Sequence, residues 1–395
     1  MANYSRDLGD TRKLLRKAAI VGAYTTAQGD MRDRTTDDLV LEAITGAMAD
    51  AGMTLDEVDG IAGGRSLTAS AASAYPGYWS ELLGHSLHYH TLSDTAAAAH
   101  CANILHAGIA VASGLADTIV VVGGGSRGGD SHQKVLAMAN AHGEFDASWG
   151  TLVPSWFALL ARRHMHEFGT TSEQLAQIAV STRAWAGMHP QAIMKKPLTI
   201  DEVINSRMIS DPLHLLDCCL VNDGAGALVI TSTERAKDCA KKPVYLLGGA
   251  EDYTFRGYVD ICHDWLSSGA IHTGKRSLEM AGLKNSEIDL VEVYDCFTIT
   301  VLRELEDLGF CKLGEGGAFV ADGKLGPGGS LPTNTHGGGL SWGHMFSGLA
   351  HGIEAVHQLR GECGPRQVKG AETALVHAQG GPVALHSTVI MSSVL

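Results

Sequence analysis

The sequence lacks a surplus of basic residues, a long apolar run and a leader-like N-terminus. It has 30 Lys and Arg against 43 Asp and Glu, a formal net charge of −13, so we expect no nucleic-acid partner, which would need cations against its phosphates. No run of about 18 uncharged apolar residues is present, so we expect no membrane span. The first residues carry charges where a signal peptide would be apolar. These absences predict a soluble, cytoplasmic protein.

Metal-binding and disulfide spacings are missing as well. The eight cysteines form no CxxC pair, which favours reduced thiols. The stretch HSLHYH brings His85, His88 and His90 together without a carboxylate or cysteine partner. We therefore expect no metal site and no tightly bound cofactor.

An internal repeat is present. The segment AMADAGMTLDEVDGIAGG (47–64) is echoed by LEMAGLKNSEIDLVEVYD (278–295). In both, a helical pattern ends at Ala-Gly, where glycine suits a helix C-cap. A short linker then leads into an apolar strand. A chain of 395 residues with 45% apolar residues is long enough for a core in each of two such halves.

A second pair of units repeats in the same order. The helix over 96–114 precedes the strand TIVVVGGG, and the helix over 344–361 precedes ALVHAQGG. Both helices are small or apolar nearly all round and both strands are continuous apolar runs, which is typical of fully covered elements. The pattern predicts two α/β halves, 1–240 and 241–395, with a helical insertion at about 126–212 that forms a lid. The alternative is two unrelated Rossmann-like domains.

Five motifs carry a resemblance to a known family. In order they are VNDGAGALVI, VEVYDCFTI, NTHGGGLSWGH, AVHQLRG and VHAQGG, from Val221 to Gly381. This ordered set resembles the thiolase superfamily, and in particular its sterol-carrier-protein thiolase-like branch. The resemblance implies a five-layered αβαβα sandwich of two pseudo-symmetric halves, which the internal repeat predicts independently.

The resemblance also exposes a missing nucleophile. Family members carry a cysteine at the start of the first buried helix, 17 residues before the glycine that closes it. Counting back from Gly114 gives Ala97, and the same count from Gly361 gives His344, the family's Gly-His histidine. Cys101 lies four residues further along, about one helical turn away, and we interpret it as a core cysteine, since buried apolar thiols are usually inert.

Without that cysteine, acyl transfer through an enzyme thioester is not expected. Retro-aldol cleavage of a β-hydroxyacyl-CoA needs only a base at the hydroxyl and hydrogen-bond donors at the thioester oxygen. YDCFT and AVHQLRG are also similar to the cysteine-less, thiolase-type aldolases that cleave steroid side-chain CoA esters. Those aldolases use two tyrosines, and this chain has His344 in place of the second. The resemblance implies release of acetyl- or propionyl-CoA, with a ketone or aldehyde, from a bulky hydrophobic acyl chain.

Four residues are the candidate catalytic groups. Tyr294 occupies the position of the thiolase asparagine and would donate to an oxyanion or relay a proton, and Asp295 would orient water or a neighbouring histidine. His344 would bind the thioester oxygen or move the substrate proton. His377, which replaces a second family cysteine, is a further acid/base candidate. For substrate binding we expect backbone N–H groups of the glycine-rich turns, beside a bare methyl group; these residues are Gly338, Gly339, Gly380, Gly381 and Ala97.

Two alternatives stay open. One is a thiolase or acyl-CoA C-acyltransferase with another nucleophile, Cys101 or Cys296. The other is a degenerate acyl-CoA-binding subunit that scaffolds a partner. In either case the coenzyme A would be part of the substrate. The resemblance further implies a homodimer formed through the first-half sheet, and a small OB-fold, zinc-ribbon partner protein that helps to hold CoA.

Overall fold

The computed structural model describes residues 9–63, 76–93, 95–127, 152–254, 264–381 and 383–395. Nine strands form one mixed sheet in the order β3-β2-β4-β7-β1-β8-β11-β10-β9. They are β1 (Ala18–Thr25), β2 (Gly60–Gly63), β3 (Tyr89–Thr91), β4 (Thr118–Gly125), β7 (Gly224–Ser232), β8 (Val244–Tyr253), β9 (Leu290–Val293), β10 (Thr373–Gly380) and β11 (Leu385–Ser392). A separate pair is formed by β5 (Met208–Ser210) and β6 (Leu213–His214).

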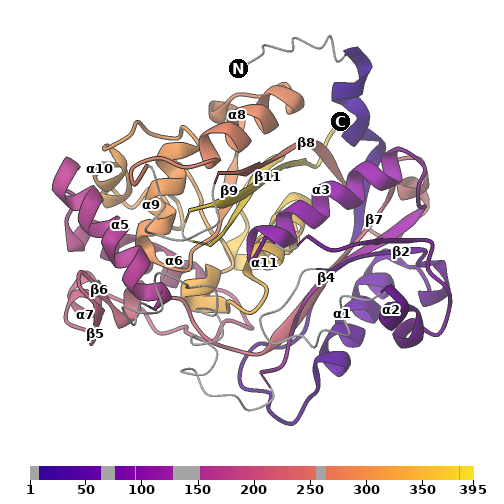
Figure 1. The fold of residues 1–395 in the computed structure, drawn as a ribbon, viewed down its shortest axis with the longest axis horizontal. Helices are drawn as coiled ribbons and strands as arrows, with labels where there is room; N and C mark the ends of the chain where they lie inside the picture. Colours follow the sequence, from indigo (N-terminus) through magenta and orange to yellow (C-terminus); the bar gives the residue numbers. More distant parts are fainter. Residues whose placement is uncertain (1–8, 64–75, 94, 128–151, 255–263, 382) are drawn as a thin grey trace.

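The helices divide into two central ones and an outer set. Central α3 (Ala98–Ala112) and α11 (Ser347–Arg360) contact each other and strands of both halves of the sheet. By contrast, α1 contacts β1, β4 and β7 of the first half, and α8 contacts β8 and β11 of the second. The layers therefore run α1, first half-sheet, α3 with α11, second half-sheet, α8 (Figure 1), as the sequence predicted. The outer helices are α1 (Thr36–Ala51), α2 (Pro76–Leu83), α5 (Val153–Phe168), α6 (Ser172–Gly187), α7 (Ile200–Ile204), α8 (Ala270–Ala281), α9 (Thr298–Asp307) and α10 (Gly316–Ala321).

The two halves repeat each other in detail, which confirms the internal repeat. Gly52 and Gly282, which close α1 and α8, both have φ of 74°, the left-handed conformation that glycine adopts without strain. Asp59 then accepts hydrogen bonds from the backbone N–H groups at the start of β4. Asp289 does the same at the start of β10. The half-sheets join where β1 pairs with β8 over two residue pairs.

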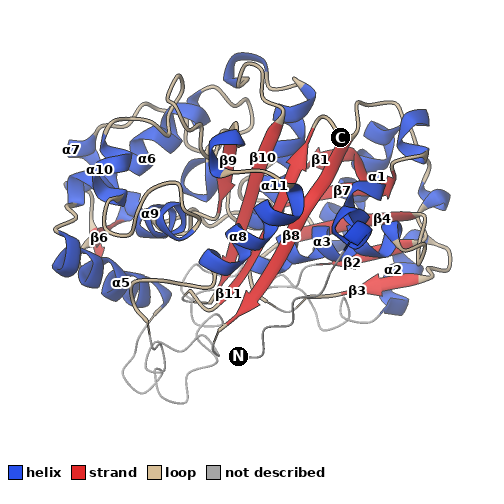
Figure 2. Cartoon of the chain, turned by 90° about the horizontal axis from the view of Figure 1, so that it is seen from above, coloured by secondary structure: helices blue, strands red, loops and turns tan. Residues whose placement is uncertain are grey.

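The predicted insertion is present between β4 and β7. Its helices α5, α6 and α7 gather with α9 and α10 at the β9 side of the sheet (Figure 2), and α6 contacts both α9 and α10. Residues 128–151, which belong to the predicted insertion, lie outside the described part. The boundaries at 126–212 and at residue 240 stay predictions. In the described part of the chain, no helix is long and apolar enough to cross a membrane.

One helix begins later than its sequence pattern suggested. We expected His344 at the start of the second buried helix, but α11 begins at Ser347. Phe346 has φ of −133° there, and its buried ring packs so closely on Gly226 that a Cβ on that glycine would lie 2.5 Å from a ring carbon. His344 therefore lies in the connection between a π-turn, η9 (Gly338–Trp342), and α11.

Candidate active site

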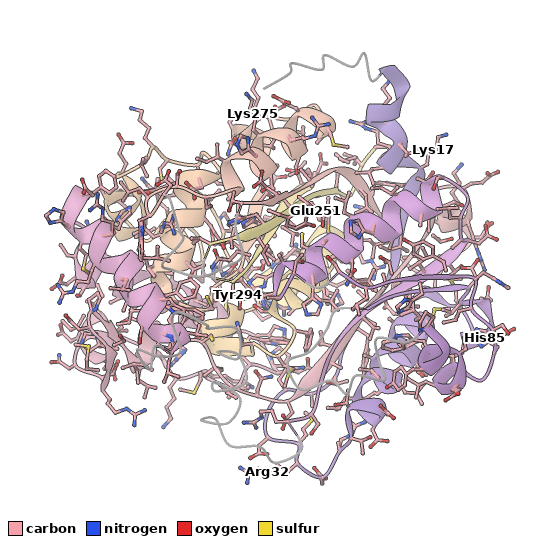
Figure 3. All side chains as sticks on the ribbon, viewed as in Figure 1. Lys17, Arg32, His85, Glu251, Lys275 and Tyr294 are labelled. Carbon is pink, nitrogen blue, oxygen red and sulfur yellow. The ribbon has the colours of Figure 1, made fainter. Side chains whose placement is uncertain are left out.

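Tyr294 and His344 form the centre of the candidate site. Tyr294 follows the end of β9 and lies near the middle of the molecule (Figure 3). Its hydroxyl is 2.8 Å from Nε2 of His344, and the two rings are 5.3 Å apart. The tyrosine is buried and the histidine is half-buried. The structure thus brings together two residues that the sequence selected independently.

The pair is electrically neutral near pH 7. Burial, with the charge of Asp295 among the lesser causes, holds the pKa of Tyr294 well above its ordinary value. Burial lowers the pKa of His344 to about 4, although Asp295 opposes that shift. A neutral imidazole carries one proton, on Nδ1 or on Nε2, and its tautomer decides which of the two groups donates. When the proton is on Nδ1, Nε2 of His344 accepts the hydrogen bond from the Tyr294 hydroxyl.

An asparagine holds the His344 backbone in place. The N–H of His344 donates to Oδ1 of Asn222 over 2.6 Å. Nδ2 of Asn222 donates in turn to Oε1 of Gln28 and to the carbonyl of Asp223. Asn222 belongs to the VNDGAGALVI motif just before β7. The positioning of His344 is therefore one structural task of that motif.

Asp295 holds the π-turn η9, which precedes His344. Its Oδ1 accepts the N–H of Gly339 over 2.7 Å, and its Oδ2 accepts the N–H of Leu340 over 3.2 Å. The Gly339 N–H, which the sequence suggested as a thioester donor, therefore has another acceptor. Gly338 has no room for a side chain, because a Cβ there would lie 2.0 Å from Oδ2 of Asp295. Its contact with substrate stays a prediction.

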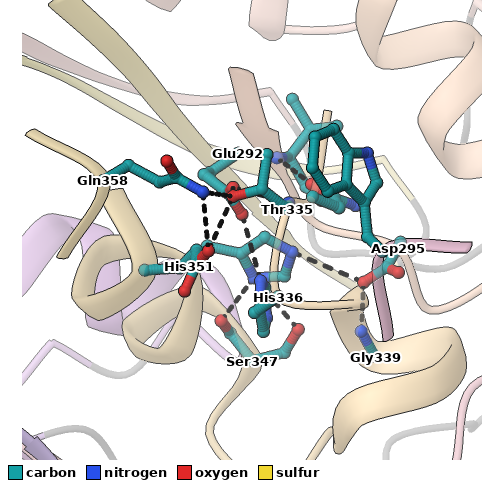
Figure 4. Close-up of polar contacts among 12 residues, drawn as sticks. Glu292, Asp295, Thr335, His336, Gly339, Ser347, His351 and Gln358 are labelled. Atoms are coloured by element: carbon teal, nitrogen blue, oxygen red, sulfur yellow. Dashed lines mark hydrogen bonds and ion pairs between the residues drawn. The ribbon is translucent and has the colours of Figure 1, made fainter. Parts of the chain in front are cut away.

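A cluster of buried polar side chains that includes His351, His336 and Glu292 lies next to Asp295 (Figure 4). Nδ1 of His351 donates to the carbonyl of Ser347, and its Nε2 lies 3.5 Å from Oδ1 of Asp295. Glu292 lies 3.2 Å from His336 in the same cluster. Burial opposes a proton on His351, but Asp295 and Glu292 outweigh it and raise the pKa of His351.

The same cluster is the one candidate metal-binding site in the described part of the chain. The donor atoms of Glu292, His336 and His351 lie within 4.8 Å of one another and could hold a cation. Burial also raises the pKa of Glu292 to about 8, although His351 opposes the rise. Oε2 of Glu292, both ring nitrogens of His336 and Nε2 of His351 have no hydrogen-bond partner among the described residues. Sequence reasoning expected no metal site and did not detect this cluster.

His377 lies at the end of a directed hydrogen-bond chain. Thr273 donates to the carbonyl of Ala270, and Thr388 donates to Thr273. The Thr388 oxygen therefore accepts from Nδ1 of His377, 2.8 Å away. This fixes the tautomer of His377, with the proton on Nδ1 and a lone pair on Nε2.

The lone pair of His377 faces a second imidazole. Nε2 of His386 lies 3.0 Å from the carbonyl of Val383, to which it donates, so its Nδ1 carries a lone pair 3.3 Å from Nε2 of His377. Burial and the neighbouring His386 keep the pKa of His377 well below its ordinary value. The hydrogen bond between Tyr294 and His377 joins their backbones, with the Tyr294 N–H donating to the His377 carbonyl. The acid/base role of His377 stays a prediction.

The start of α3 meets the start of α11 and the end of β10. Ala97 is the N-cap of α3, and a Cβ on Gly348 of α11 would lie 2.7 Å from its carbonyl oxygen. A Cβ on Gly380 would lie 2.0 Å from the carbonyl oxygen of Thr95. The three segments are therefore in direct contact. Gly381, in the turn after β10, is exposed.

His100 is a residue that sequence reasoning missed. It is buried on α3, one turn after Ala97, and no described residue is bonded to its Nδ1. Burial, with a contribution from His344, lowers the pKa of His100 to about 4, so the two imidazoles are neighbours. A Cβ on Gly123 would lie 2.3 Å from the His100 ring. The available signal was its place in a mostly apolar helix, whose other polar residues are Asn103 and His106.

Neither candidate thiol resembles a nucleophile. Cys101 is fully buried, with its Sγ 3.5 Å from the carbonyl of Val376. Burial raises the pKa of Cys101 to about 12. Cys296 is also buried, contacts Thr300, and has a pKa raised by burial. Reactive cysteines need the opposite, an accessible position and a stabilised thiolate.

Known proteins match the chain along most of its length. Residues 18–234 match the family described as "Thiolase, N-terminal domain", and residues 256–393 match "Thiolase C-terminal domain-like". An acetyl-CoA acetyltransferase of Methanothermobacter thermautotrophicus is 35% identical over 382 residues, which cover 94% of this chain and 99% of that protein. The 17-hydroxy-3-oxo-4-pregnene-20-carboxyl-CoA lyase of Mycobacterium tuberculosis is 35% identical over 384 residues, which cover 92% and 97%.

A solved structure agrees with these matches. The "Ltp2-ChsH2(DUF35) aldolase" superposes with a TM-score of 0.85 at 32% identity, covering 95% of this chain and 98% of that chain. The family matches, the relatives and the five-layered fold all lead to the same result, which the sequence motifs predicted. The chain belongs to the thiolase family.

Proposed function

We propose that the chain cleaves the Cα–Cβ bond of a β-hydroxyacyl-CoA by retro-aldol chemistry. The products are acetyl- or propionyl-CoA and a ketone or aldehyde. The observation that carries the proposal is the Tyr294–His344 hydrogen bond beside a helix start whose residue is Ala97. This arrangement can move a proton, but its helix start cannot hold an acyl group covalently.

The proposed step begins with a proton relay. Tyr294 accepts the proton of the substrate β-hydroxyl while its own proton passes to Nε2 of His344, so no buried phenolate forms. The Cα–Cβ bond then breaks, the β-carbon becomes a carbonyl, and the electron pair moves into the thioester as an enolate. Tyr294 and His344 return the proton to Cα, which completes the short acyl-CoA. One proton leaves the substrate and one returns.

His344 is suited to both halves of this cycle. It is neutral at the start because its pKa is about 4. Once it has accepted the relayed proton, its positive charge lies next to the developing enolate and stabilises it in a site that excludes much of the water. Oriented by Asn222, His344 would therefore act as the proton acceptor and as the electrostatic partner of the enolate.

The names of two similar proteins support a lyase and a bulky substrate. The Mycobacterium tuberculosis relative is named as the lyase of a pregnene carboxyl-CoA, and the similar solved structure is named as an aldolase. We propose that this chain acts on an acyl-CoA with a similarly bulky hydrophobic tail, in degradation of a steroid-like side chain. A cytoplasmic location belongs to the same proposal.

The proposal includes partner proteins. The solved aldolase carries a second component, ChsH2(DUF35), in its name. We infer that this chain also pairs with a small OB-fold, zinc-ribbon subunit that helps to hold CoA, and that it forms a homodimer. Activity measurements therefore need the isolated chain and the reconstituted complex side by side.

An acyltransferase is the second candidate. It is favoured by His344, which is the thiolase-like residue at this position, and by an acetyltransferase relative that is as similar as the lyase. The buried, high-pKa thiols of Cys101 and Cys296 argue against it.

One assay separates the two candidates. The complex is incubated with a β-hydroxyacyl-CoA that has a bulky tail, and separately with the matching β-ketoacyl-CoA and free CoA. Retro-aldol activity gives a ketone or aldehyde with a short acyl-CoA from the first substrate alone. Turnover of the second substrate alone, with an acylated cysteine, would establish the acyltransferase instead.

A further inference from the structure

The polar cluster beside Asp295 has the donor set of a transition-metal site. Glu292, His336 and His351 each offer one donor atom, and the three atoms lie within 4.8 Å of one another. Glu292 and His351 are fully buried and His336 is 2% exposed, so bulk water does not solvate these atoms. Two imidazoles and one carboxylate suit Zn²⁺ and other divalent transition metals, whereas Mg²⁺ and Ca²⁺ prefer oxygen ligands alone.

The donor atoms of this cluster form no hydrogen bonds with the rest of the described chain. They are Oε2 of Glu292, both ring nitrogens of His336 and Nε2 of His351. Native structures rarely leave a buried polar atom unpaired, and each such atom calls for an explanation such as a bound ion. Here several of them belong to one small cluster. A cation would accept one lone pair from each of the three side chains.

One distance in the cluster has the length expected between two ligands of the same ion. Oε2 of Glu292 and Nδ1 of His336 are 3.2 Å apart (Figure 4), although neither atom forms a hydrogen bond with a described residue. Ligand atoms about 2.1 Å from a tetrahedral ion lie about 3.4 Å from each other. The two atoms are therefore spaced like two corners of a coordination tetrahedron.

The remaining polar atoms of two of these side chains are held as they are in metal ligands. Nδ1 of His351 donates to the carbonyl of Ser347, which leaves the lone pair of the neutral imidazole on Nε2. Oε1 of Glu292 accepts the N–H of Thr335 over 2.9 Å and lies 2.9 Å from its hydroxyl oxygen. Metal-binding histidines nearly always donate their other N–H to a carbonyl or carboxylate, and ligating carboxylates are hydrogen-bonded in turn. This support is independent of the unpaired donor atoms.

The charges around the cluster also favour a cation. Glu292 and Asp295 are fully buried, and over the described ranges their ion-pair contacts are with His336 and His351, not with Lys or Arg. The nearby carboxylate that does have an arginine is that of Glu354, which is paired with Arg366 over 2.9 Å. Buried carboxylates need a compensating charge. A divalent ion would supply it and would displace any protons from its ligands.

We propose that Glu292, His336 and His351 bind a divalent transition-metal ion, for which Zn²⁺ is the best match. Glu292 lies on β9, two residues before Tyr294. His336 precedes η9, and His351 lies on α11. Because His344 lies between η9 and α11 in the chain, the ion would link the segments that carry Tyr294 and His344. The proposal goes beyond the proposed function and does not depend on it.

The metal content of the full chain tests the proposal without an activity assay. The untagged chain is expressed without a partner protein in zinc-supplemented medium, passed through a desalting column in EDTA, and analysed by inductively coupled plasma mass spectrometry. We expect about one transition-metal ion per chain, because an ion enclosed by the fold leaves only when the fold opens. Denaturation in EDTA should release it. Less than about 0.1 ion per folded chain after the EDTA column would overturn the proposal.

Paired variants locate the ion. Glu292→Gln and His336→Gln each remove one ligand, and we expect the metal content to fall at least about 10-fold in both. Glu279→Gln and His272→Gln make the same changes at exposed positions of α8 and should keep the full metal content. A folded ligand variant that retains the metal would place the ion elsewhere and overturn the proposal.

X-ray absorption spectroscopy on the wild-type chain decides the matter even if neither ligand variant folds. At the zinc edge we expect nitrogen and oxygen ligands at about 2.0–2.1 Å, the scattering pattern of two imidazoles, and no sulfur at about 2.3 Å. Sulfur ligands would assign the ion to cysteines and overturn the proposal.

Thermal unfolding tests whether the ion links the three segments. Wild-type chain from zinc-supplemented medium is compared with chain from metal-depleted medium, and we expect the zinc-loaded form to unfold about 5 °C or more higher, because the ion binds only the folded state. Glu292→Gln should show no such difference between the two media. Equal midpoints for the two wild-type preparations would contradict the linking role.

Discussion

The starts of the two central helices differ far more than the frameworks that hold them. Both helices end at a left-handed glycine, Gly114 for α3 and Gly361 for α11. At the start of α3, however, the structure places the methyl group of Ala97. Ahead of α11 it places the imidazole of His344, held outside the helix.

This contrast shows which parts of a duplicated fold are free to diverge. Asp59 and Asp289 fix equivalent strand starts in the two halves, so the framework is kept where it organises the backbone. The reactive ends contribute little to that organisation and can change from thiol to methyl without loss of the fold. The chemistry that remains is then set by the second half of the chain, which contributes Tyr294 and His344.

Removal of the Tyr294 hydroxyl should have the largest effect on that chemistry. Tyr294→Phe keeps the buried ring but interrupts the proton relay, and we expect kcat for retro-aldol cleavage to fall about 10³-fold with KM nearly unchanged. Steady-state kinetics on the complex measures it, with circular dichroism as the folding control. A variant with kcat within a few-fold of wild type would place the relay elsewhere.

Replacement of His344 should have the next largest effect. His344→Gln can still accept a hydrogen bond from Tyr294 but cannot take up a proton, so we expect kcat to fall about 10²-fold. His344→Ala, which also removes the hydrogen bond, should be at least as slow. Similar kcat for wild type and His344→Gln would mean that hydrogen bonding alone accounts for the role of His344.

A thiol introduced at the start of α3 tests whether that position is accessible to reagents. Ala97 is only partly buried and lies at a helix N-terminus, which lowers thiol pKa values. In the variant Ala97→Cys, we expect iodoacetamide to alkylate the introduced thiol at least about 10-fold faster than the buried Cys101, as measured by peptide mass spectrometry. Equal inertness of the two thiols would contradict an open reaction centre at the start of α3.

Activity should fall on the acid side of the pH profile only at a pH well below the ordinary pKa of histidine. The catalytic form of His344 is the neutral imidazole, and its pKa is lowered to about 4 by burial. Activity should therefore be constant from pH 7 down to about pH 5 and should halve only near about pH 4. The log of kcat/KM against pH, with a stability control at each pH, measures this limb. A limb near about 6.5 would indicate an unperturbed histidine.

Removal of the Cys101 thiol should have the smallest effect. Its pKa is raised to about 12 by burial, so it is not ionised during turnover. We expect Cys101→Ala to keep kcat within about 2-fold of wild type and to lose about 1 kcal/mol of unfolding free energy, because a small core group is removed. Loss of kcat without loss of stability would restore the acyltransferase alternative.

The sequence contained enough information for the framework because its signals are local. Ala-Gly at the ends of α1 and α8 marks a helix C-cap, and continuous apolar runs mark covered strands. The five layers, the repeat and the family were therefore predictable. The later start of α11 was not, because it depends on how Phe346 packs against Gly226.

The site was only partly predictable because its contacts are not local. Tyr294 and His344 were selected by motif, but their hydrogen bond depends on η9 and on Asn222 from the other half of the chain. His100 was missed because nothing in the pattern of α3 distinguishes it from the other polar residues of that helix, Asn103 and His106. The acceptor of the Gly339 N–H was missed because Asp295 lies 44 residues earlier in the chain.

Rapid-quench mass spectrometry of the intact chain during turnover tests the central claim most directly. With a bulky β-hydroxyacyl-CoA we predict that the ketone or aldehyde and a short acyl-CoA accumulate while the mass of the protein stays unchanged at every time point. A protein species heavier by one acyl group, formed and consumed at the rate of turnover, would contradict cleavage by a proton relay between Tyr294 and His344.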